Sequence, residues 1–138
     1  MSVKETAVAY HAGGYNCCQS VLCALKEYTG LTEETSAALG YGFGGGMFCG
    51  NVCGAVTGGL MAIGKACLGV ENVAEEKRRM ESLAKSLEAD FEAEIGTLLC
   101  REIVEAHGKT YCDHCIAFSA ETAEKLILKE NTTKTEGE

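Results

Sequence analysis

The chain has 138 residues, of which nine are cysteine and none is proline, and it carries a formal charge of −8. This length suits one domain with its own core, and an odd number of thiols cannot pair completely within one chain, so a scaffold held together by disulfides is disfavoured. The negative charge repels nucleic-acid phosphates, and we expect no nucleic-acid partner.

The first residues, 1–6, are polar and lack the apolar core of a signal peptide, which favours a cytoplasmic protein with reduced thiols. Residues 35–64 carry no charge and raise the question of a membrane span. Glycines at 40–46 interrupt this apolar run and leave only 52–64, whereas a spanning helix needs about 20 residues. We therefore expect a buried helix and no membrane association.

Helical periodicity recurs along the chain without strand-like alternation, which predicts an all-α fold. Residues 1–131 are expected to form a single helical bundle. The polar residues 132–138 are expected to form a disordered tail. The predicted helices, in chain order, cover residues 3–12, 16–29, 32–39, 51–68 and 75–88, followed by one that starts at the N-cap Thr97 and one that starts at Cys112 or Asp113.

The helix predicted at 51–68 has the clearest pattern. Apolar side chains recur at spacings of three and four, which makes one buried stripe: Cys53, Val56, Leu60, Ile63 and Cys67. Small residues form a parallel ridge that would let a neighbouring backbone approach closely: Gly54, Gly58, Ala62 and Ala66. The sequence therefore predicts that this helix is central. Cys53 begins it, where the helix dipole favours a thiolate.

Other cysteines fall into recognisable spacings. Cys112 and Cys115 form a CxxC pair, which serves redox dithiols or half of a zinc or iron-sulfur site. The chain lacks the βαβ context of thioredoxin and the CxxCH of haem attachment. Cys49 and Cys53 form a CxxxC, but the third cysteine of a radical-type iron-sulfur loop is missing. Packing in the core is the expected role of Cys23 and Cys67.

Five parts of the chain combine into a larger pattern: residues 15–21, 42–46, 53–58 and 100–102, and Cys112. Together they resemble the C_GCAxxG_C_C proteins, a family named for its cysteines and regarded as redox-active. The central motif stands here as CGAxxG. The family is in turn similar to the non-haem part of split-Soret cytochromes c, which carry an iron-sulfur centre besides haem. Because this chain has no CxxCH, only the iron-sulfur cluster, and not the haem, would carry over from this similarity.

The resemblance implies that four dispersed cysteines form one site: Cys17, Cys53, Cys100 and Cys112. Adjacent or nearby thiols are reserve candidates: Cys18, Cys49 and Cys115. Such a site would hold a [2Fe-2S] or [4Fe-4S] cluster for electron transfer, or work as redox dithiols. The partner would be a redox protein or a small thiol, and electron transfer is favoured over an enzyme with its own substrate.

Two other hypotheses remain open at this point. One is a structural or sensory metal-binding module, with zinc as the candidate metal. The other is a helical interaction subunit whose cysteines are mostly core. In each case a homodimer is expected, because two-fold dimers are the commonest soluble assembly and the apolar content of 40–64 is high for one small bundle.

Overall fold

The computed structural model describes residues 1–136, and side chains as far as residue 132. Within this part of the chain the fold is all-α, as predicted, and the only strand-like pairing is an isolated bridge between Val52 and Leu99. The α-helices are α1 (Val3–Ala12), α2 (Cys17–Ala24), α3 (Lys26–Thr29), α4 (Glu33–Gly40), α5 (Gly54–Cys67), α6 (Val73–Ile95), α7 (Cys100–His107) and α8 (Cys112–Glu136).

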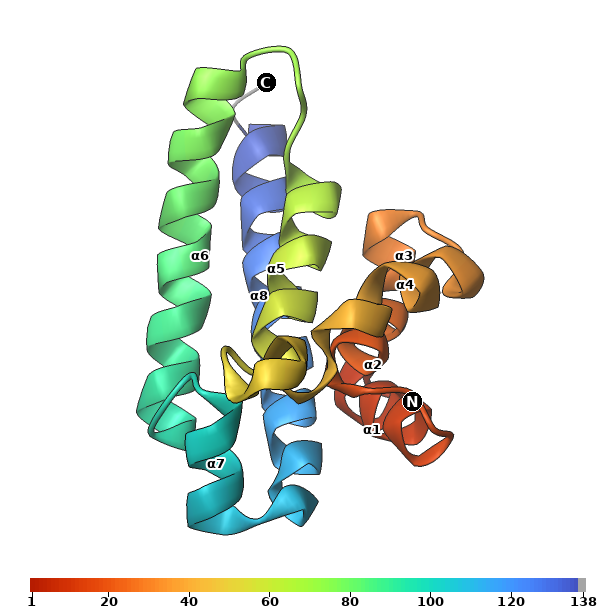
Figure 1. Ribbon diagram of the computed structural model, residues 1–138. Coiled ribbons are helices and arrows are strands. Elements are labelled where there is room, and N and C mark those ends of the chain that lie inside the picture. Colours follow the sequence, from red (N-terminus) through yellow and green to blue (C-terminus); the bar gives the residue numbers. More distant parts are fainter. Residues whose placement is uncertain (137–138) are drawn as a thin grey trace.

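Helices α5, α6 and α8 run side by side, α1, α2 and α3 pack against the other side of α5 and α8, and α4 lies outside them on α2 (Figure 1). Because α5 contacts α2, α3, α6 and α8, its predicted central position is confirmed. The core around it is aliphatic with one large aromatic ring. Its largest fully buried side chains are Phe91, Leu22, Leu25, Ile63, Leu87, Ile103, Ile116 and Ile127.

Glycines let α5 approach its neighbours closely. A Cβ atom on Gly58 would lie 2.7 Å from the carbonyl oxygen of Cys18, and one on Gly54 would lie 2.7 Å from the carbonyl oxygen of Phe43. On the other side of α5, a Cβ on Gly59 would lie 2.9 Å from the side chain of Leu87. Real Cβ atoms do not come so close, so Gly54 and Gly58, which face backbone, require glycine, whereas a side chain at Gly59 would require Leu87 to move.

The helix predicted at 51–68 begins three residues later, at Gly54, because residues 51–53 take part in the bridge to 98–100. Other predicted boundaries are wrong as well. The helix predicted at 16–29 is interrupted at Leu25, whose φ of −99° and ψ of 14° separate α2 from α3. Thr97 is not an N-cap; its hydroxyl accepts a hydrogen bond from the backbone N–H of Leu99, and α7 begins at Cys100. The outer helix predicted at 75–88 is longer, because Phe91 and Ile95 continue its buried face.

The residues predicted as a disordered tail, 132–138, begin inside α8, which continues to Glu136. Within this helix the Thr132 hydroxyl donates a hydrogen bond of 2.9 Å to the carbonyl of Leu128. Residues 137 and 138 lie outside the described part of the chain.

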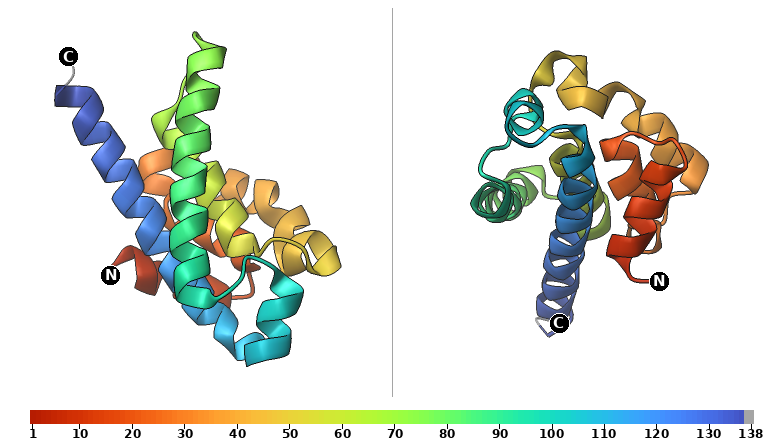
Figure 2. Two further views of the ribbon diagram at one scale, coloured as in Figure 1. Left: turned by 90° about the vertical axis from the view of Figure 1, so that its left-hand side faces the viewer. Right: turned by 90° about the horizontal axis from the view of Figure 1, so that it is seen from below.

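The glycine-rich connection between α4 and α5 is compact. It consists of η1 (Tyr41–Phe43), a 3₁₀ turn, and η2 (Gly46–Gly50), whose Met47 and Phe48 have φ of 62° and 60°. Positive φ is uncommon for residues with a side chain. The connection lies beside α7 at one end of the bundle (Figure 2). None of the described helices is both long and apolar enough to cross a membrane.

Candidate functional site

Cys17 is positioned by the capping of α2. The Asn16 side chain accepts a hydrogen bond of 2.9 Å from the Gln19 N–H, and the Gln19 side chain accepts one of 2.9 Å from the Asn16 N–H. Both side chains also donate to the end of α4, at the carbonyls of Gly40 and Ala37. This reciprocal box satisfies free backbone groups and fixes the first residue of the helix, Cys17.

Cys53 and Cys100 are tied together through the backbone. The N–H of Cys53 donates to the carbonyl of Leu98, and the N–H of Cys100 donates to the carbonyl of Asn51, both at 2.7 Å. These bonds flank the bridge between residues 52 and 99. Cys53 is the N-cap of α5, and Cys100 is the first residue of α7. The bridge therefore brings the starts of two helices to one place.

Cys112 and Cys115 lie one turn apart at the start of α8. One turn further along this helix, the buried Ser119 hydroxyl donates a hydrogen bond of 2.6 Å to the carbonyl of Ala55 in α5. This bond holds the first turns of α8 against the first turn of α5. The two cysteines of the CxxC pair therefore lie at the place where Cys53 begins its helix.

The thiols meet as a connected cluster. Cys17 is a hydrogen-bond partner of both Cys53 and Cys112, and Cys53 is also a partner of Cys115. The four sulfurs thus follow one another in the order Cys112, Cys17, Cys53 and Cys115, and we call this set the thiol cluster. Its members come from α2, from the N-cap of α5 and from the start of α8. All of them are free thiols.

Cys53 carries the most stabilised thiolate. Hydrogen bonds from the thiols of Cys115 and Cys17, together with the N–H groups of Ala55 and Val56, outweigh burial and lower the pKa of Cys53 to about 4. A thiolate at neutral pH is therefore favoured at the centre of the cluster.

The pKa values of the thiols around Cys53 are shifted in opposite directions. Hydrogen bonding to Cys112 and Cys53, with burial, raises the pKa of Cys17, and hydrogen bonding to Cys53 does the same for Cys115. Both act as donors. The hydrogen bond from Cys17 lowers the pKa of Cys112 to about 7. Burial, followed by the negative charges at Cys53 and Cys112, raises the pKa of Cys100.

A pocket of about 300 Å³ opens beside the cluster. Its lining combines three cysteines with basic, amide and small side chains: His11, Asn16, Cys17, Gly45, Cys100, Val104, Lys109 and Cys112. Cys100 thus shares the pocket with Cys17 and Cys112, although it is not among the hydrogen-bonded thiols. Cys53 and Cys115 are 4% and 1% exposed and lie behind it. The pocket makes part of the cluster accessible to small molecules.

Of the three reserve candidates, only one is part of the thiol cluster. Cys115 belongs to the cluster, whereas Cys18 is buried, and its pKa rises to about 11 through that burial. Cys49 is exposed in η2, and its thiol donates to the carbonyl of Gly46 at 3.4 Å. Cys23 and Cys67 are buried in the core, as predicted.

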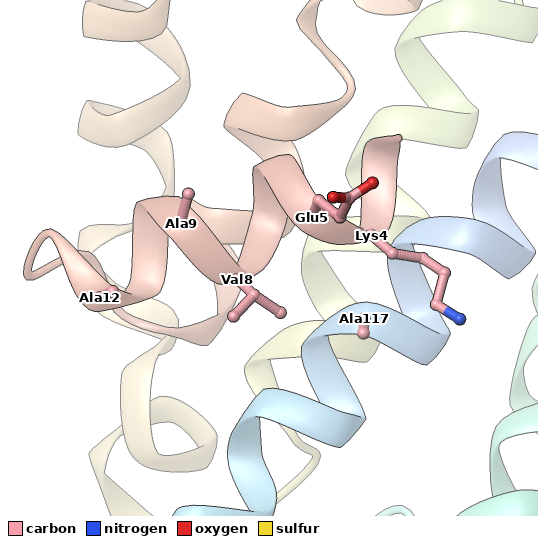
Figure 3. A pocket seen from close by; sticks show the side chains of 6 residues that line it. All are labelled: Lys4, Glu5, Val8, Ala9, Ala12 and Ala117. Carbon is pink, nitrogen blue, oxygen red and sulfur yellow. The ribbon is translucent and has the colours of Figure 1, made fainter. Parts of the chain in front are cut away.

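A larger hollow of about 460 Å³ lies on the outside of the bundle between α1 and α8 (Figure 3). Its lining is mostly small and apolar, with two charged side chains: Lys4, Glu5, Val8, Ala9, Ala12 and Ala117. The lining contains no nucleophile. The chemistry of the described residues therefore points to the thiol cluster and not to this hollow.

Sequence reasoning missed the polar groups around the cluster. His11 Nδ1 lies 2.7 Å from an Asp113 carboxylate oxygen, and both charges act on Cys112. Lys109 lines the pocket from the turn between α7 and α8. No local motif marks His11 or Lys109, because the fold joins segments about a hundred residues apart. Among the described residues, no group of three or more His, Cys, Asp or Glu is arranged so that it could hold a metal ion.

With this geometry in place, comparison with known proteins gives one match. The family model described as "Putative redox-active protein (C_GCAxxG_C_C)" matches residues 15–127. The chain belongs to the C_GCAxxG_C_C family. No curated protein and no solved structure matches it. The match spans the whole thiol cluster and Cys100.

The central motif of this family member has its cysteine and glycine in the order Cys53-Gly54-Ala55, where the family's lettering has Gly-Cys-Ala. The structure accounts for this order. At position 54 a Cβ would lie 3.2 Å from the Cβ of Cys17 and 3.0 Å from the Cys18 nitrogen. A side chain does not fit there, whereas position 53 directs a thiol into the cluster.

Proposed function

We propose that this C_GCAxxG_C_C protein is a thiol-disulfide redox protein in which Cys17 forms a disulfide with Cys112 or Cys53. The proposal rests on the position of Cys17, which shares a pocket with Cys112 and is a hydrogen-bond partner of both Cys112 and Cys53. Formation of either disulfide transfers two electrons and two protons from the pair to a partner disulfide, which is reduced to two thiols. Such exchange requires thiols that remain reduced between cycles, which fits a reducing compartment such as the cytoplasm.

The surroundings of the thiols support this reaction. A disulfide forms when a thiolate attacks a neighbouring oxidised sulfur, and the cluster places lowered and raised thiol pKa values side by side. The lowered values supply thiolates at neutral pH, and the protonated Cys17 stabilises them. Because Cys17 lies between the two thiolates, it is the shared member of both disulfides.

The test is a disulfide map of protein that was reduced, oxidised with one equivalent of diamide and digested at acid pH. We expect peptides that join Cys17 to Cys112 or Cys53, and loss of both in Cys17→Ser. Cys23→Ser is the matched control because Cys23 lies buried in the same helix but outside the cluster. Pairing that is scattered over all cysteines, or unchanged in Cys17→Ser, would refute the proposal.

A second candidate function is one-electron transfer by an iron-sulfur cluster. The residue type fits, because thiolates are the soft ligands that such clusters and zinc require, whereas the described side chains are not arranged as a metal site. Cys17, Cys53, Cys100 and Cys112 would hold the group, with Cys115 as the nearest substitute. Iron, zinc and acid-labile sulfide in anaerobically purified protein decide between the candidates. Stoichiometric iron and sulfide that Cys100→Ser abolishes would favour the cluster, whereas metal-free protein with the expected disulfides would favour the dithiol.

A further inference from the structure

Resting on the dithiol function, we propose that the pocket beside the thiol cluster binds small anionic disulfides, and that Cys112 is the thiol that attacks them. The pocket, the accessibility of the sulfurs and the charges of the lining support this assignment independently.

Accessibility selects the attacking residue. Cys53 and Cys115 are buried, whereas Cys17, Cys100 and Cys112 are partly exposed and line the pocket. Cys100 is not among the hydrogen-bonded thiols and has no resolving thiol behind it, which leaves Cys17 and Cys112 as the working pair. Cys17 has Cys53 on one side and Cys112 on the other, so it is the inner member of the exposed pair. A disulfide that enters the pocket therefore meets Cys112 with Cys17 directly behind it. This is the arrangement of an attacking and a resolving thiol.

The size of the pocket selects small substrates. Its volume of about 300 Å³ is at the lower end of the range for small-molecule sites. The lining is mainly apolar around the sulfurs, which suits the methylene groups on either side of a disulfide bond.

Charge selects among small disulfides. The chain has a net charge of −8, yet the lining contains Lys109 and His11 and no carboxylate. The acidic side chain next to Cys112 is Asp113, and its carboxylate is paired with His11 at 2.7 Å. Among the described residues, Lys109 has no ion pair with a carboxylate. It is therefore available to a carboxylate of the substrate, and an acidic protein presents a basic entrance at this place.

The reaction balances in two exchanges. The Cys112 thiolate attacks one substrate sulfur, so that a Cys112–substrate disulfide forms, the substrate S–S bond breaks and the first thiolate leaves. Cys17 then loses its proton and attacks the Cys112 sulfur, which releases the second thiolate and leaves a Cys17–Cys112 disulfide. The two protons of the cysteines end on the two product thiols. The substrate is reduced by two electrons and the cysteine pair is oxidised by two.

A matched set of disulfides tests the proposal. The probes are 3,3′-dithiodipropionate with two negative charges, bis(2-hydroxyethyl) disulfide with none, and cystamine with two positive charges. Rates of oxidation are measured at low salt in a Cys49→Ser background, since Cys49 is exposed and outside the cluster. Each rate is compared between the parent and Lys109→Gln, so that differences in the intrinsic reactivity of the probes cancel.

We expect Lys109→Gln to slow oxidation by the dianion about three- to tenfold relative to the neutral probe, and to leave or speed oxidation by cystamine. In Cys17→Ser, mass spectrometry should find the first mixed disulfide on Cys112. Equal effects of Lys109→Gln on all three probes, or a first adduct on another cysteine, would overturn the inference even if diamide still forms the Cys17–Cys112 disulfide. Absence of that disulfide with diamide would instead refute the underlying dithiol function.

Discussion

The thiol of Cys115 donates a hydrogen bond to Cys53, although these residues are 62 positions apart and Cys115 lies outside the set of cysteines that the family pattern assigns. This bond joins the start of α8 to the start of α5. It makes Cys115 a positioning residue, because Cys115 acts through the thiolate that it stabilises and is itself shielded from solvent.

Replacement of Cys115 by alanine removes the leading donor to Cys53 and should raise the pKa of that thiol. We expect the thiolate absorbance near 240 nm, which Cys53 contributes at pH 6, to be reduced in Cys115→Ala. Cys115→Ser is the matched control, since its hydroxyl can still donate and should retain most of the signal. Identical titrations of the parent and the alanine variant would contradict this role.

The stability of the reduced protein should rise with pH across the neutral range. The pKa of Cys53 is about 4 in the folded protein and about 9 when the chain is unfolded. Between these values the unfolded state binds more protons, so the free energy of unfolding increases with pH and is lost again as pH falls toward 4. Cys112, with a pKa of about 7, adds to the rise between pH 7 and 9.

Urea unfolding at pH 5 and pH 8 in the presence of a phosphine reductant measures this effect. Cys53→Ser should show a smaller gain in the free energy of unfolding between the two pH values. Above pH 9 the sign reverses, because the raised pKa values of Cys17 and Cys115 keep protons on the folded state. A parent and a variant with the same pH dependence would contradict the thiolate at Cys53.

Gly58→Ala should destabilise the fold. Its new Cβ would lie 2.7 Å from the backbone oxygen of Cys18, and such overpacking costs about 1 to 3 kcal/mol. Gly64→Ala is the matched control in the same helix, because no heavy atom lies within 4 Å of the new Cβ. There we expect a gain of about 0.5 to 1 kcal/mol from helix propensity. Thermal unfolding of both variants provides the comparison, and equal effects would show that α5 is not in close contact with α2.

Phe48→Gly should stabilise the protein, since Phe48 has a φ of 60° and is 78% exposed. Relief of the left-handed conformation is worth about 1 kcal/mol, and little buried surface is lost. The same change at Leu39, which is 52% exposed within α4, should instead cost about 1 kcal/mol. Loss of stability in Phe48→Gly would mean that this side chain makes contacts that its exposure conceals.

The helical architecture could be predicted from sequence because its signals are local. Asn16 and Thr32 cap helices as their residue types predict, and Gly30 ends α3 in the left-handed conformation. The small residues of 54–58 likewise predict close packing. Thr97 misled the prediction, because the pairing of Leu99 with Val52 delays the start of α7, and such a bridge depends on a segment far away in the chain.

Less of the site than of the fold could be predicted from the sequence. The family pattern identified Cys17, Cys53 and Cys112, which the fold joins, and Cys100, which it places on the shared pocket. Cys115 stood only in reserve, although its one-turn spacing from Cys112 at the start of a helix was the available signal. The role of Lys109 depends on which side chains the tertiary fold gathers around the pocket, and no local pattern contains that information.

The bridge between residues 52 and 99 has a consequence for the assembly of the chain. Cys17 and Cys53 belong to the first half of the sequence, whereas Cys100, Cys112 and Cys115 belong to the second. The two halves meet at this bridge, where the N–H of Cys53 bonds to the carbonyl of Leu98 and the N–H of Cys100 bonds to the carbonyl of Asn51. A nascent chain that has produced only α1 to α5 therefore exposes the Cys53 sulfur without the donor from α8. Cys53 gains the leading donor to its thiolate, and its shielding from solvent, only when the last helix docks, so completion of folding and completion of the site are one event.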